Sequence, residues 1–398
     1  MSVLSLLRDR SFAGLLASNM VLGTAFPIQL ILGGLSGLML APSPGLATLP
    51  SAVQTLAGLV AAAPMSLLMG RLGRRAGFAL GAGLTLAAAL CAIHALYATS
   101  FAWLCAAHFM MGAGWAAFQF FRFAAADAAP PALRPIAISL MLSALLGAAL
   151  LGPQVFISAK DALAPVPLAG GYAAIGVIAL LGVLLLALVR LPRPQAPPEA
   201  NRNSSLAALR RADVQRAIAI AALAQGIMVF MMIPTPIAII GCGLSEAVAG
   251  DVIRWHIVAM FAPSFVTGSL IQRVGAQPIA ITGLVIMVCA AAGAAHGLSA
   301  GHFYGALIAL GLGWNFGFIG ATTLLERALS DAEKPALQGI NDTIIALVST
   351  LSAFAAGFVI TYLGWALLAL CAGAVVVLGL VCLALSQPTR RPRGSPLT

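Results

Sequence analysis

Residues 216–240 read RAIAIAALAQGIMVFMMIPTPIAII, an apolar run whose one charge stands at its first position. A helix needs about 20 apolar residues to cross the hydrocarbon core of a bilayer, which is about 30 Å thick. A segment in lipid must satisfy its own backbone hydrogen bonds, so only helices and closed barrels can cross. This run is too long and too uniformly apolar for a barrel strand. The stretch therefore predicts a membrane-spanning helix.

Similar runs recur along the rest of the chain. Of its 398 residues, 61% are hydrophobic and 8% are charged, whereas about a quarter of the residues in an ordinary soluble domain are charged. The pattern predicts an all-α integral membrane protein with twelve transmembrane helices. They lie near residues 12–34, 46–69, 77–98, 101–122, 134–157, 170–190, 216–240, 251–271, 277–297, 302–325, 336–361 and 365–386.

The basic residues predict the orientation. If both termini are cytoplasmic, all of the 21 lysines and arginines except Lys160 and Arg254 lie on the cytoplasmic side. Cytoplasmic loops of membrane proteins are enriched in this way. We therefore expect cytoplasmic termini and a multi-pass protein of a bacterial inner membrane. The net charge of +10 then reports topology, and nucleic acid is not an expected partner.

Three short motifs occur twice at nearly the same offset. GAGW at 112–115 is echoed by GLGW at 311–314, PALR at 131–134 by PALQ at 335–338, and RLG at 71–73 by RVG at 273–275. Such repetition predicts two pseudo-symmetric six-helix bundles. The predicted halves are residues 1–192 and 216–398, and the polar stretch 193–215 is the predicted cytoplasmic linker between them.

The repeated loop motif resembles the signature of the major facilitator superfamily, which places a GxLxDRxGRR-like segment after the second span and a weaker copy after the eighth. Gly70 and Gln272 stand where that family usually has an acid, so both copies of the motif lack the carboxylate of the usual charge pair. Positive-inside anchoring is the alternative role for these arginines. Arg122 with Asp127, and Arg327 with Glu326, are candidates for charge contacts at the inner face, with interfacial snorkelling as the alternative. The candidate gating residues are Arg71, Gly73, Arg74, Arg75, Arg122, Asp127, Gly268, Arg273 and Gly275.

Two pairs of residues four apart stand out in the seventh and eighth spans. Met228 and Met232 form one pair, and His256 and Met260 form the other. Residues four apart share one face of a helix. With a rise of about 1.5 Å per residue, Met228 and Met260 lie roughly 18 and 16 Å from the inner side, and Met232 and His256 roughly 24 and 22 Å. The two pairs are therefore predicted to lie level, near the middle of the membrane.

Thioether sulfur and imidazole nitrogen are uncharged ligands, and the soft thioether favours cuprous copper over zinc, magnesium or calcium. Methionine is also an ordinary gap-filling residue in apolar helices, so any one of these sulfurs could serve packing alone. A histidine in mid-membrane is costly to bury without a partner, which makes His256 a functional candidate. From the residues alone, a metal site and simple packing remain alternatives.

The flanking segments IPTPIAIIGC at 233–242 and WHIVAMFAPSFVTG at 255–268, with RFAAAD at 122–127, resemble the CcoA-type bacterial copper importers of the same superfamily. That resemblance implies that copper is imported into the cytoplasm by alternating access and becomes available for cytochrome oxidase assembly. It implies the copper ligands Met228, Met232, His256 and Met260. Cytoplasmic or membrane copper-handling proteins are then expected partners, and the carrier is expected to be a monomer.

Weaker candidates surround this set. Accessory metal or redox roles are considered for Met231, Cys242, Cys371, His108 and Met111. Asp342 is a candidate for proton coupling, with hydrogen bonding at a helix end as the alternative. His94, His296 and His302 fall near the outer ends of spans, where a solvated histidine is expected.

Two other functions compete with copper import. A broad exporter of lipophilic cations or drugs could use the same methionine-lined cavity, and a membrane-embedded copper-binding assembly factor would bind without transporting. The sequence carries no nucleotide-binding loop, nucleophile with a base, or redox cofactor motif, so we expect no enzyme and no tightly bound cofactor. Copper is expected as the substrate.

Overall fold

The computed structural model describes residue 6 and residues 8–130, 133–189, 208–330 and 333–385. Within these ranges the chain forms helices and no strands. Residues 193–207 of the predicted linker, and residues 131–132 of one repeated motif, lie outside the described residues. The boundary between the predicted halves therefore stays a prediction.

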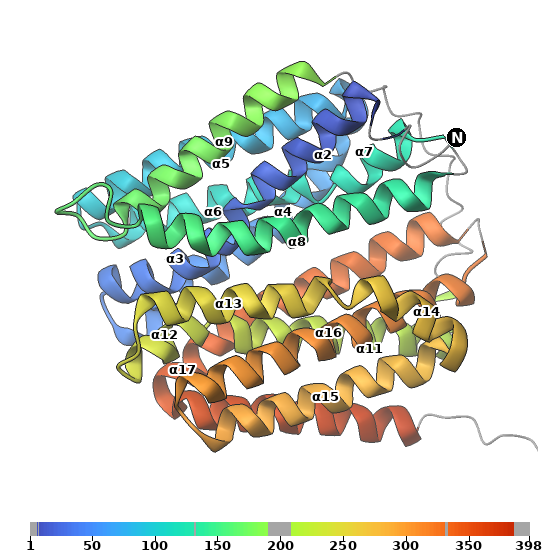
Figure 1. The fold of residues 1–398 in the computed structure, drawn as a ribbon. Helices are drawn as coiled ribbons and strands as arrows, with labels where there is room; N and C mark the ends of the chain where they lie inside the picture. Colours follow the sequence, from blue (N-terminus) through green and yellow to red (C-terminus); the bar gives the residue numbers. More distant parts are fainter. Residues whose placement is uncertain (1–5, 7, 131–132, 190–207, 331–332, 386–398) are drawn as a thin grey trace, which may run out of the picture.

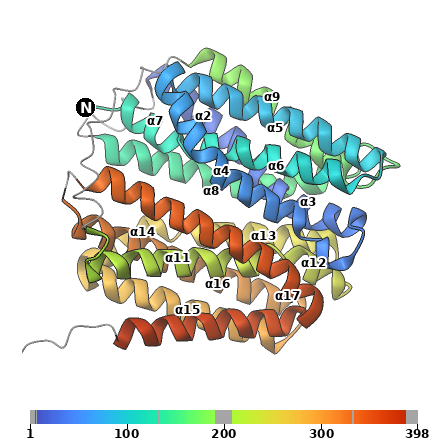
Figure 2. The same ribbon diagram turned by 180° about the vertical axis from the view of Figure 1, so that it is seen from behind.

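The helices gather in two bundles that lie side by side (Figures 1 and 2). The first bundle contains α2 (Arg10–Gly23), α3 (Ala25–Leu40), the short 3-10 helix η1 (Pro44–Leu46), α4 (Leu49–Leu72), α5 (Arg74–Tyr97), α6 (Phe101–Phe118), α7 (Phe121–Ala128), α8 (Arg134–Ala159) and α9 (Ala169–Leu188). The second contains α11 (Ala212–Met232), α12 (Thr235–Gly241), α13 (Glu246–Phe261), α14 (Ser264–Val274), α15 (Ala276–His296), α16 (Ala300–Ala328) and α17 (Lys334–Leu385).

Ten helices among the described residues are long and apolar enough to cross a membrane. The last of them continues through Gly364, whose φ of 75° breaks the helix between the predicted eleventh and twelfth spans. Helix α8 covers the predicted fifth span, and its stretch Ser143–Ala159 is apolar but shorter than these ten helices. The all-helical membrane fold is confirmed, whereas the count of twelve spans and the cytoplasmic termini stay predictions.

The two bundles share their internal packing. In the first, a Cβ added to Gly114 would lie 2.7 Å from the carbonyl oxygen of Gly81, so α5 and α6 touch backbone to backbone. In the second, a Cβ on Gly313 would lie 2.8 Å from the carbonyl oxygen of Gly283, between α15 and α16. These glycines are related by the sequence offsets of the repeat, so the bundles are pseudo-symmetric in their contacts as well as in their order.

The turns of the two signature copies are also equivalent. Gly73 joins α4 to α5 with a φ of 90°, and Gly275 joins α14 to α15 with a φ of 100°. Side chains other than glycine rarely adopt this region. Each glycine donates its N–H at 2.9 Å to the carbonyl four residues back, which closes the preceding helix. The repeated RxG motif therefore encodes a tight helix-to-helix turn in each bundle.

We call the end of the molecule where α2, α5 and α8 begin the basic end, because Arg10, Arg74 and Arg134 start these helices. It lies on the right in Figure 1, beside the N-terminal label. The helix connections at the other end of the bundles, such as those between α3 and α4 and between α15 and α16, form the far end.

The bundles are tied together at the far end. Lys160, which caps α8, lies 3.1 Å from Glu246 at the start of α13, and 2.7 Å from Asp161. The hydroxyl of Thr361 donates to the carbonyl oxygen of Pro44 at 3.2 Å. Hydrogen bonds from Lys160 to Asp161, and then to Glu246, raise the pKa of its ammonium group. Polar contacts therefore join the two halves at this end.

Candidate functional site

A cavity of about 60 Å³ lies between the two bundles. Its walls come from α2, α3, α6 and α8 on one side and from α11 and α13 on the other. It is lined by Gly23, Phe26, Pro27, Trp115, Leu145, Ala148, Met228, Met232, Ile257, Met260 and Phe261. These side chains carry no ionisable group, so the cavity is a neutral chamber at the interface between the bundles.

Three of the four predicted copper ligands line this cavity. Met228 and Met232 reach it from α11, and Met260 reaches it from α13. Their exposed fractions are 4%, 5% and 7%, so the thioethers are buried in the described state. Spacing by four residues put the first two on one helical face, and the third reaches the same cavity from α13, which packs, as α11 does, against the shared neighbour α16. The structure therefore brings three soft sulfur side chains to one chamber.

His256, the fourth predicted ligand, is fully buried on α13, one turn from Met260, and is not among the lining residues. Its Nδ1 lies 2.7 Å from the carbonyl oxygen of Leu307 on α16. A carbonyl oxygen can only accept a hydrogen bond, so Nδ1 carries the proton and Nε2 keeps its lone pair. Nε2 is buried and finds no hydrogen-bond partner among the described residues. The ring thus holds an unused acceptor in the form that metals bind.

The accessory candidates are spread over the molecule. Met231 is fully buried beside the pair on α11 but does not line the cavity, and Met111 is fully buried in α6. Cys242 caps α12 and is half-buried, and burial raises the pKa of its thiol. Cys371 is exposed on α17. The structure does not bring these side chains to the methionine-lined chamber.

His108 belongs to a closed polar network inside the first bundle. Its Nδ1 lies 2.8 Å from Oε1 of Gln54, and its Nε2 lies 2.8 Å from the hydroxyl of Tyr172. Gln54 in turn donates to Oε1 of Gln29 at 2.9 Å, and the Tyr172 hydroxyl lies 2.6 Å from that of Ser36. Both ring nitrogens of His108 are engaged, so this histidine has no lone pair to spare for a metal in the described state.

The charged residues of the basic end pair differently from the expectation. Arg74, not Arg122, contacts Asp127, with Nε 2.6 Å from the carboxylate. Arg122 and Asp127 are five residues apart on α7 and therefore point to different sides of the helix. Arg122 instead lies 3.9 Å from Asp342 of α17, across the interface between the bundles. The expected contact of Arg122 with Asp127 was wrong, and Asp127 supplies the acid that the loop motif itself lacks.

The other motif residues occupy the ends of helices. Arg71 lies in the last turn of α4 and Arg273 in the last turn of α14. Arg75 donates to the carbonyl oxygen of Ala187 near the end of α9 at 2.9 Å. A Cβ on Gly268 would meet open space, so close packing does not explain that glycine.

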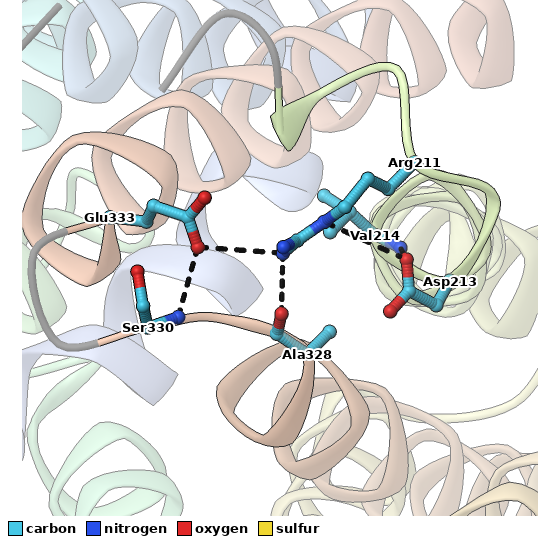
Figure 3. A network of polar contacts seen from close by, with 6 residues as sticks. All are labelled: Arg211, Asp213, Val214, Ala328, Ser330 and Glu333. Carbon is cyan, nitrogen blue, oxygen red and sulfur yellow. Dashed lines mark hydrogen bonds and ion pairs between the residues drawn. The ribbon is translucent and has the colours of Figure 1, made fainter. Parts of the chain in front are cut away.

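A second ionic cluster joins three segments of the second bundle (Figure 3). Arg211, at the start of α11, donates to the carbonyl oxygen of Ala328 at the end of α16 and lies 3.5 Å from Glu333. The backbone N–H of Ser330 donates to Glu333 at 2.9 Å and, ahead of the charge of Arg211, holds the pKa of this carboxyl below its usual range. Asp213 lies 3.9 Å from the same guanidinium. The cluster fastens the start of α11 to the α16–α17 connection.

Sequence reasoning missed the aromatic walls of the cavity. Phe26 stacks on Trp115 with ring centroids 4.3 Å apart, and Phe261 meets Trp314 edge-on at 6.0 Å. Trp115 and Trp314 end the repeated GAGW and GLGW motifs, so the repeat itself was the signal that could have placed a tryptophan near the chamber in each half.

The chain is similar to known transporters over most of its length. It is 37% identical over 342 residues to the riboflavin transporter RfnT of Brucella anthropi, covering 85% of this chain and 86% of that protein. It is 30% identical over 374 residues to YdeG of Bacillus subtilis strain 168, described as an uncharacterised MFS-type transporter, covering 89% of this chain and 87% of YdeG. No family model matches the chain.

Solved structures share the fold at low sequence identity. The nucleoside transporter NupG superposes with a TM-score of 0.72 at 13% identity, covering 95% of this chain and 99% of NupG. A D-xylose–proton symporter superposes with a TM-score of 0.71 at 15% identity, covering 93% of this chain and 96% of the symporter. At such identities the likeness concerns architecture and not cargo.

Proposed function

Because the chain belongs to the major facilitator superfamily and is a membrane transporter, we propose that its cargo is a copper ion, bound in the cavity between the two bundles. The observation that carries the proposal is the meeting of Met228, Met232 and Met260 in one buried chamber. His256 adds a lone pair one turn away on α13. Together these are the four residues that the resemblance to copper importers implies.

The donor set suits a soft monovalent cation. Thioethers select cuprous copper among the common biological metals, and imidazole also binds copper. Among the described residues, no group of three or more His, Cys, Asp or Glu side chains is placed to hold a metal ion. Calcium and magnesium sites need oxygen ligands such as carboxylates, and a zinc site usually takes three or four Cys, His, Asp or Glu side chains. The described chemistry therefore supports a cuprous ion over zinc, calcium or magnesium.

The hydrogen bond at Nδ1 of His256 supports the same cargo. Histidine ligands of metals usually donate their other ring N–H to a carbonyl or carboxylate, which fixes the tautomer and the ring orientation. The contact between Nδ1 of His256 and the carbonyl oxygen of Leu307 has this form. A buried acceptor without a partner is costly in a protein whose function does not use it. Binding of copper at Nε2 would satisfy it.

The size of the chamber also favours an ion. Pockets for organic ligands of drug size usually enclose about 300–1,000 Å³, whereas the chamber encloses about 60 Å³. A flavin ring system would require the bundles to separate around it.

Riboflavin is the second candidate, because RfnT is 37% identical to this chain. The aromatic walls formed by Phe26, Trp115 and Phe261 offer faces on which a flavin ring could stack. Export of lipophilic cations could use the same walls. A non-transporting copper-binding role would need the ligands but no opening of the chamber.

The proposal extends to the cell. The protein would lie in a bacterial inner membrane as a monomer with its basic end toward the cytoplasm. It would pass copper to copper-handling proteins there or in the membrane, and in that way serve cytochrome oxidase assembly.

The decisive experiment measures radioactive copper uptake and, in parallel, riboflavin uptake by cells that lack their own importers. The parent protein is compared with Met228→Leu/Met232→Leu/His256→Leu/Met260→Leu. Exchange of Met for Leu nearly conserves volume and usually costs less than about 1.5 kcal/mol per site. Met111→Leu/Met231→Leu is the matched control, because these two buried methionines do not line the cavity.

We expect the parent and the control to accumulate copper well beyond the amount of protein present, and the fourfold variant to accumulate none. Riboflavin uptake that persists in all three proteins, with copper uptake at background, would replace the proposal by the flavin candidate. Copper retained only in proportion to the amount of protein would indicate a binder that does not transport.

A further inference from the structure

Two histidines meet at the far end of the second bundle, away from the chamber. His296 ends α15 and His302 lies in the first turn of α16, and their ring centroids are 6.1 Å apart. His296 is exposed and His302 is half-buried, so an ion outside the protein can reach the pair. No proposed transport step uses either residue.

The surroundings fix the ring of His302. The hydroxyl of Ser299 lies 2.7 Å from its Nδ1, which leaves Nε2 for another partner. A Cβ added to Gly297 would lie 2.4 Å from Cε1 and 2.5 Å from Nε2 of the same ring. The face of the His302 ring therefore lies over Gly297, the residue that follows His296. A side chain at Gly297 would push the ring away from this position.

The separation of the rings matches that of two ligands of one metal. Two imidazoles that each bind one ion at about 2.0–2.1 Å through a nitrogen have centroids about 5 Å apart at a tetrahedral angle and about 6.3 Å apart at a linear one. The observed 6.1 Å lies within this interval, and the 50° between the ring planes leaves both rings free of stacking.

We propose that His296 and His302 form a second metal site, which takes a divalent transition-metal ion from the solution at the far end. Imidazole nitrogen is a borderline ligand, and the affinity of such sites is highest for Cu²⁺ among the first-row divalent ions. Solvent fills the remaining coordination positions, because the pair is exposed. This site differs in kind from the chamber, where thioethers favour the monovalent ion.

The two sites can be tested separately. The protein, purified without a polyhistidine tag, is titrated with Cu²⁺ in air, and the bound ion is followed by electron paramagnetic resonance for the splitting that coordinated nitrogens produce. The chain has five histidines. His94 and His256 provide controls, since His94 also lies near a far-end turn but packs edge-on against Trp103, with ring centroids 5.7 Å apart.

The parent, His94→Ala and His256→Ala should bind a single Cu²⁺ equivalent with nitrogen splitting. His296→Ala and His302→Ala should lose the splitting and the bound equivalent. Because both side chains are solvent-accessible, the variants should fold, and an unchanged unfolding temperature confirms it. Ser299→Ala, which removes a positioning residue, should weaken binding by about tenfold or more.

An unchanged signal in His296→Ala or His302→Ala would overturn the proposal, as would loss of the signal in His94→Ala or His256→Ala, or absence of binding in the parent. The test does not measure copper uptake, so the proposed second site and the proposed copper cargo can be confirmed or refuted independently.

Discussion

The same place in the two bundles carries different chemistry. Gln54 in the first bundle corresponds to His256 in the second at the offset of the RLG and RVG motifs, and His108 corresponds to Leu307 at the offset of GAGW and GLGW. In the first bundle Gln54 and His108 bond to each other. In the second, His256 bonds to the backbone of Leu307. The two bundles therefore share a geometry at this place but differ in the groups that bond, a side-chain pair in the first and a side chain with a backbone carbonyl in the second.

Neighbouring glycines show that the correspondence is structural. A Cβ on Gly112 would lie 1.9 Å from the carbonyl oxygen of Gln54, and one on Gly311 would lie 2.5 Å from that of His256. The helices therefore cross at the same point in both bundles. The two places differ in hydrogen bonding. In the first bundle both ring nitrogens of His108 have partners, whereas Nε2 of His256 has none among the described residues. The polar groups around His108 in the first bundle satisfy one another, whereas His256 in the second bundle retains a lone pair that a ligand could use.

The largest effect on copper uptake should come from giving the second bundle the residue that the first bundle has at the position of His256. His256→Gln gives the second bundle the residue of the first and removes the free imidazole nitrogen. Loss of a metal ligand should lower copper uptake on the order of 100-fold, the upper end of what disturbed metal sites show. Uptake of radioactive copper, normalised to the amount of protein in the membrane, measures it. Uptake close to that of the parent would remove His256 from the proposed site.

A smaller effect should follow from moving the His256 backbone without changing its side chain. Gly311→Ala places a methyl group against the carbonyl oxygen of His256, so α13 and α16 must separate. We expect cuprous ion affinity to fall by about tenfold, as measured by competition with a chromophoric chelator.

Gly112→Ala is the matched control, because it forces the same separation in the first bundle, against Gln54. Both variants should unfold at lower temperature than the parent. Equal loss of copper affinity in the two would mean that general loosening, and not the place of His256, sets the affinity.

Breaking the polar network around His108 should lower the stability of the protein and leave its affinity for copper unchanged. Gln54→Ala leaves His108 and Gln29 without a shared partner, and an unsatisfied buried polar group costs about 1–3 kcal/mol. Thermal unfolding in detergent should register the loss, while copper affinity per folded molecule stays constant. A stable Gln54→Ala protein with reduced copper affinity would assign the network to the transport site.

The smallest predicted effect is on the unfolding temperature and concerns the ion pair between Lys160 and Glu246, which joins the two bundles at the far end. The pKa of Lys160 is raised in the folded protein, so its stabilising contribution is complete below its usual value of 10.5 and is lost as the pH rises through the raised value. Because such exposed ion pairs contribute less than about 1 kcal/mol, the unfolding temperature should fall slightly above pH 10.5.

Unfolding scans between neutral pH and pH 11.5 or so, compared with Glu246→Gln, provide the measurement. The variant should lose part of this pH dependence while keeping the contribution of Asp161. An identical fall of the unfolding temperature at alkaline pH in both proteins would show that the ion pair between Lys160 and Glu246 does not contribute to stability.

Helical periodicity was sufficient to predict part of the site. Regular rise and spacing placed the pair Met228 and Met232 level with the pair His256 and Met260. The structure puts three of these four side chains on one cavity. Periodicity could not give the facing wall, because the contribution of Phe26 and Trp115 depends on which faces of α3 and α6 the two bundles present to each other. The partner of His256 was also hidden, since a backbone carbonyl such as that of Leu307 leaves no signal in the sequence.

Charge pairing was predicted less well than helix position. The loop motif suggested which arginines matter but not their partners, because Asp127 reaches Arg74 from another helix and Arg122 reaches across to Asp342. Such pairs depend on the packing of whole helices, and sequence distance does not report it. The ten apolar helices, in contrast, follow from composition alone, since hydrocarbon leaves a chain few other structures.

The lining of the chamber, which bears no ionisable side chain, sets how a cargo would respond to voltage. A neutral site moves no charge through the membrane field when it is empty and changes sides, whereas a loaded site moves the charge of the ion. A resting potential of 100 mV, negative inside, then contributes about 2.3 kcal/mol per elementary charge to the loaded step and nothing to the return. Import of a monovalent cation by this protein would be electrogenic, and collapse of the potential would slow it even with the proton gradient intact.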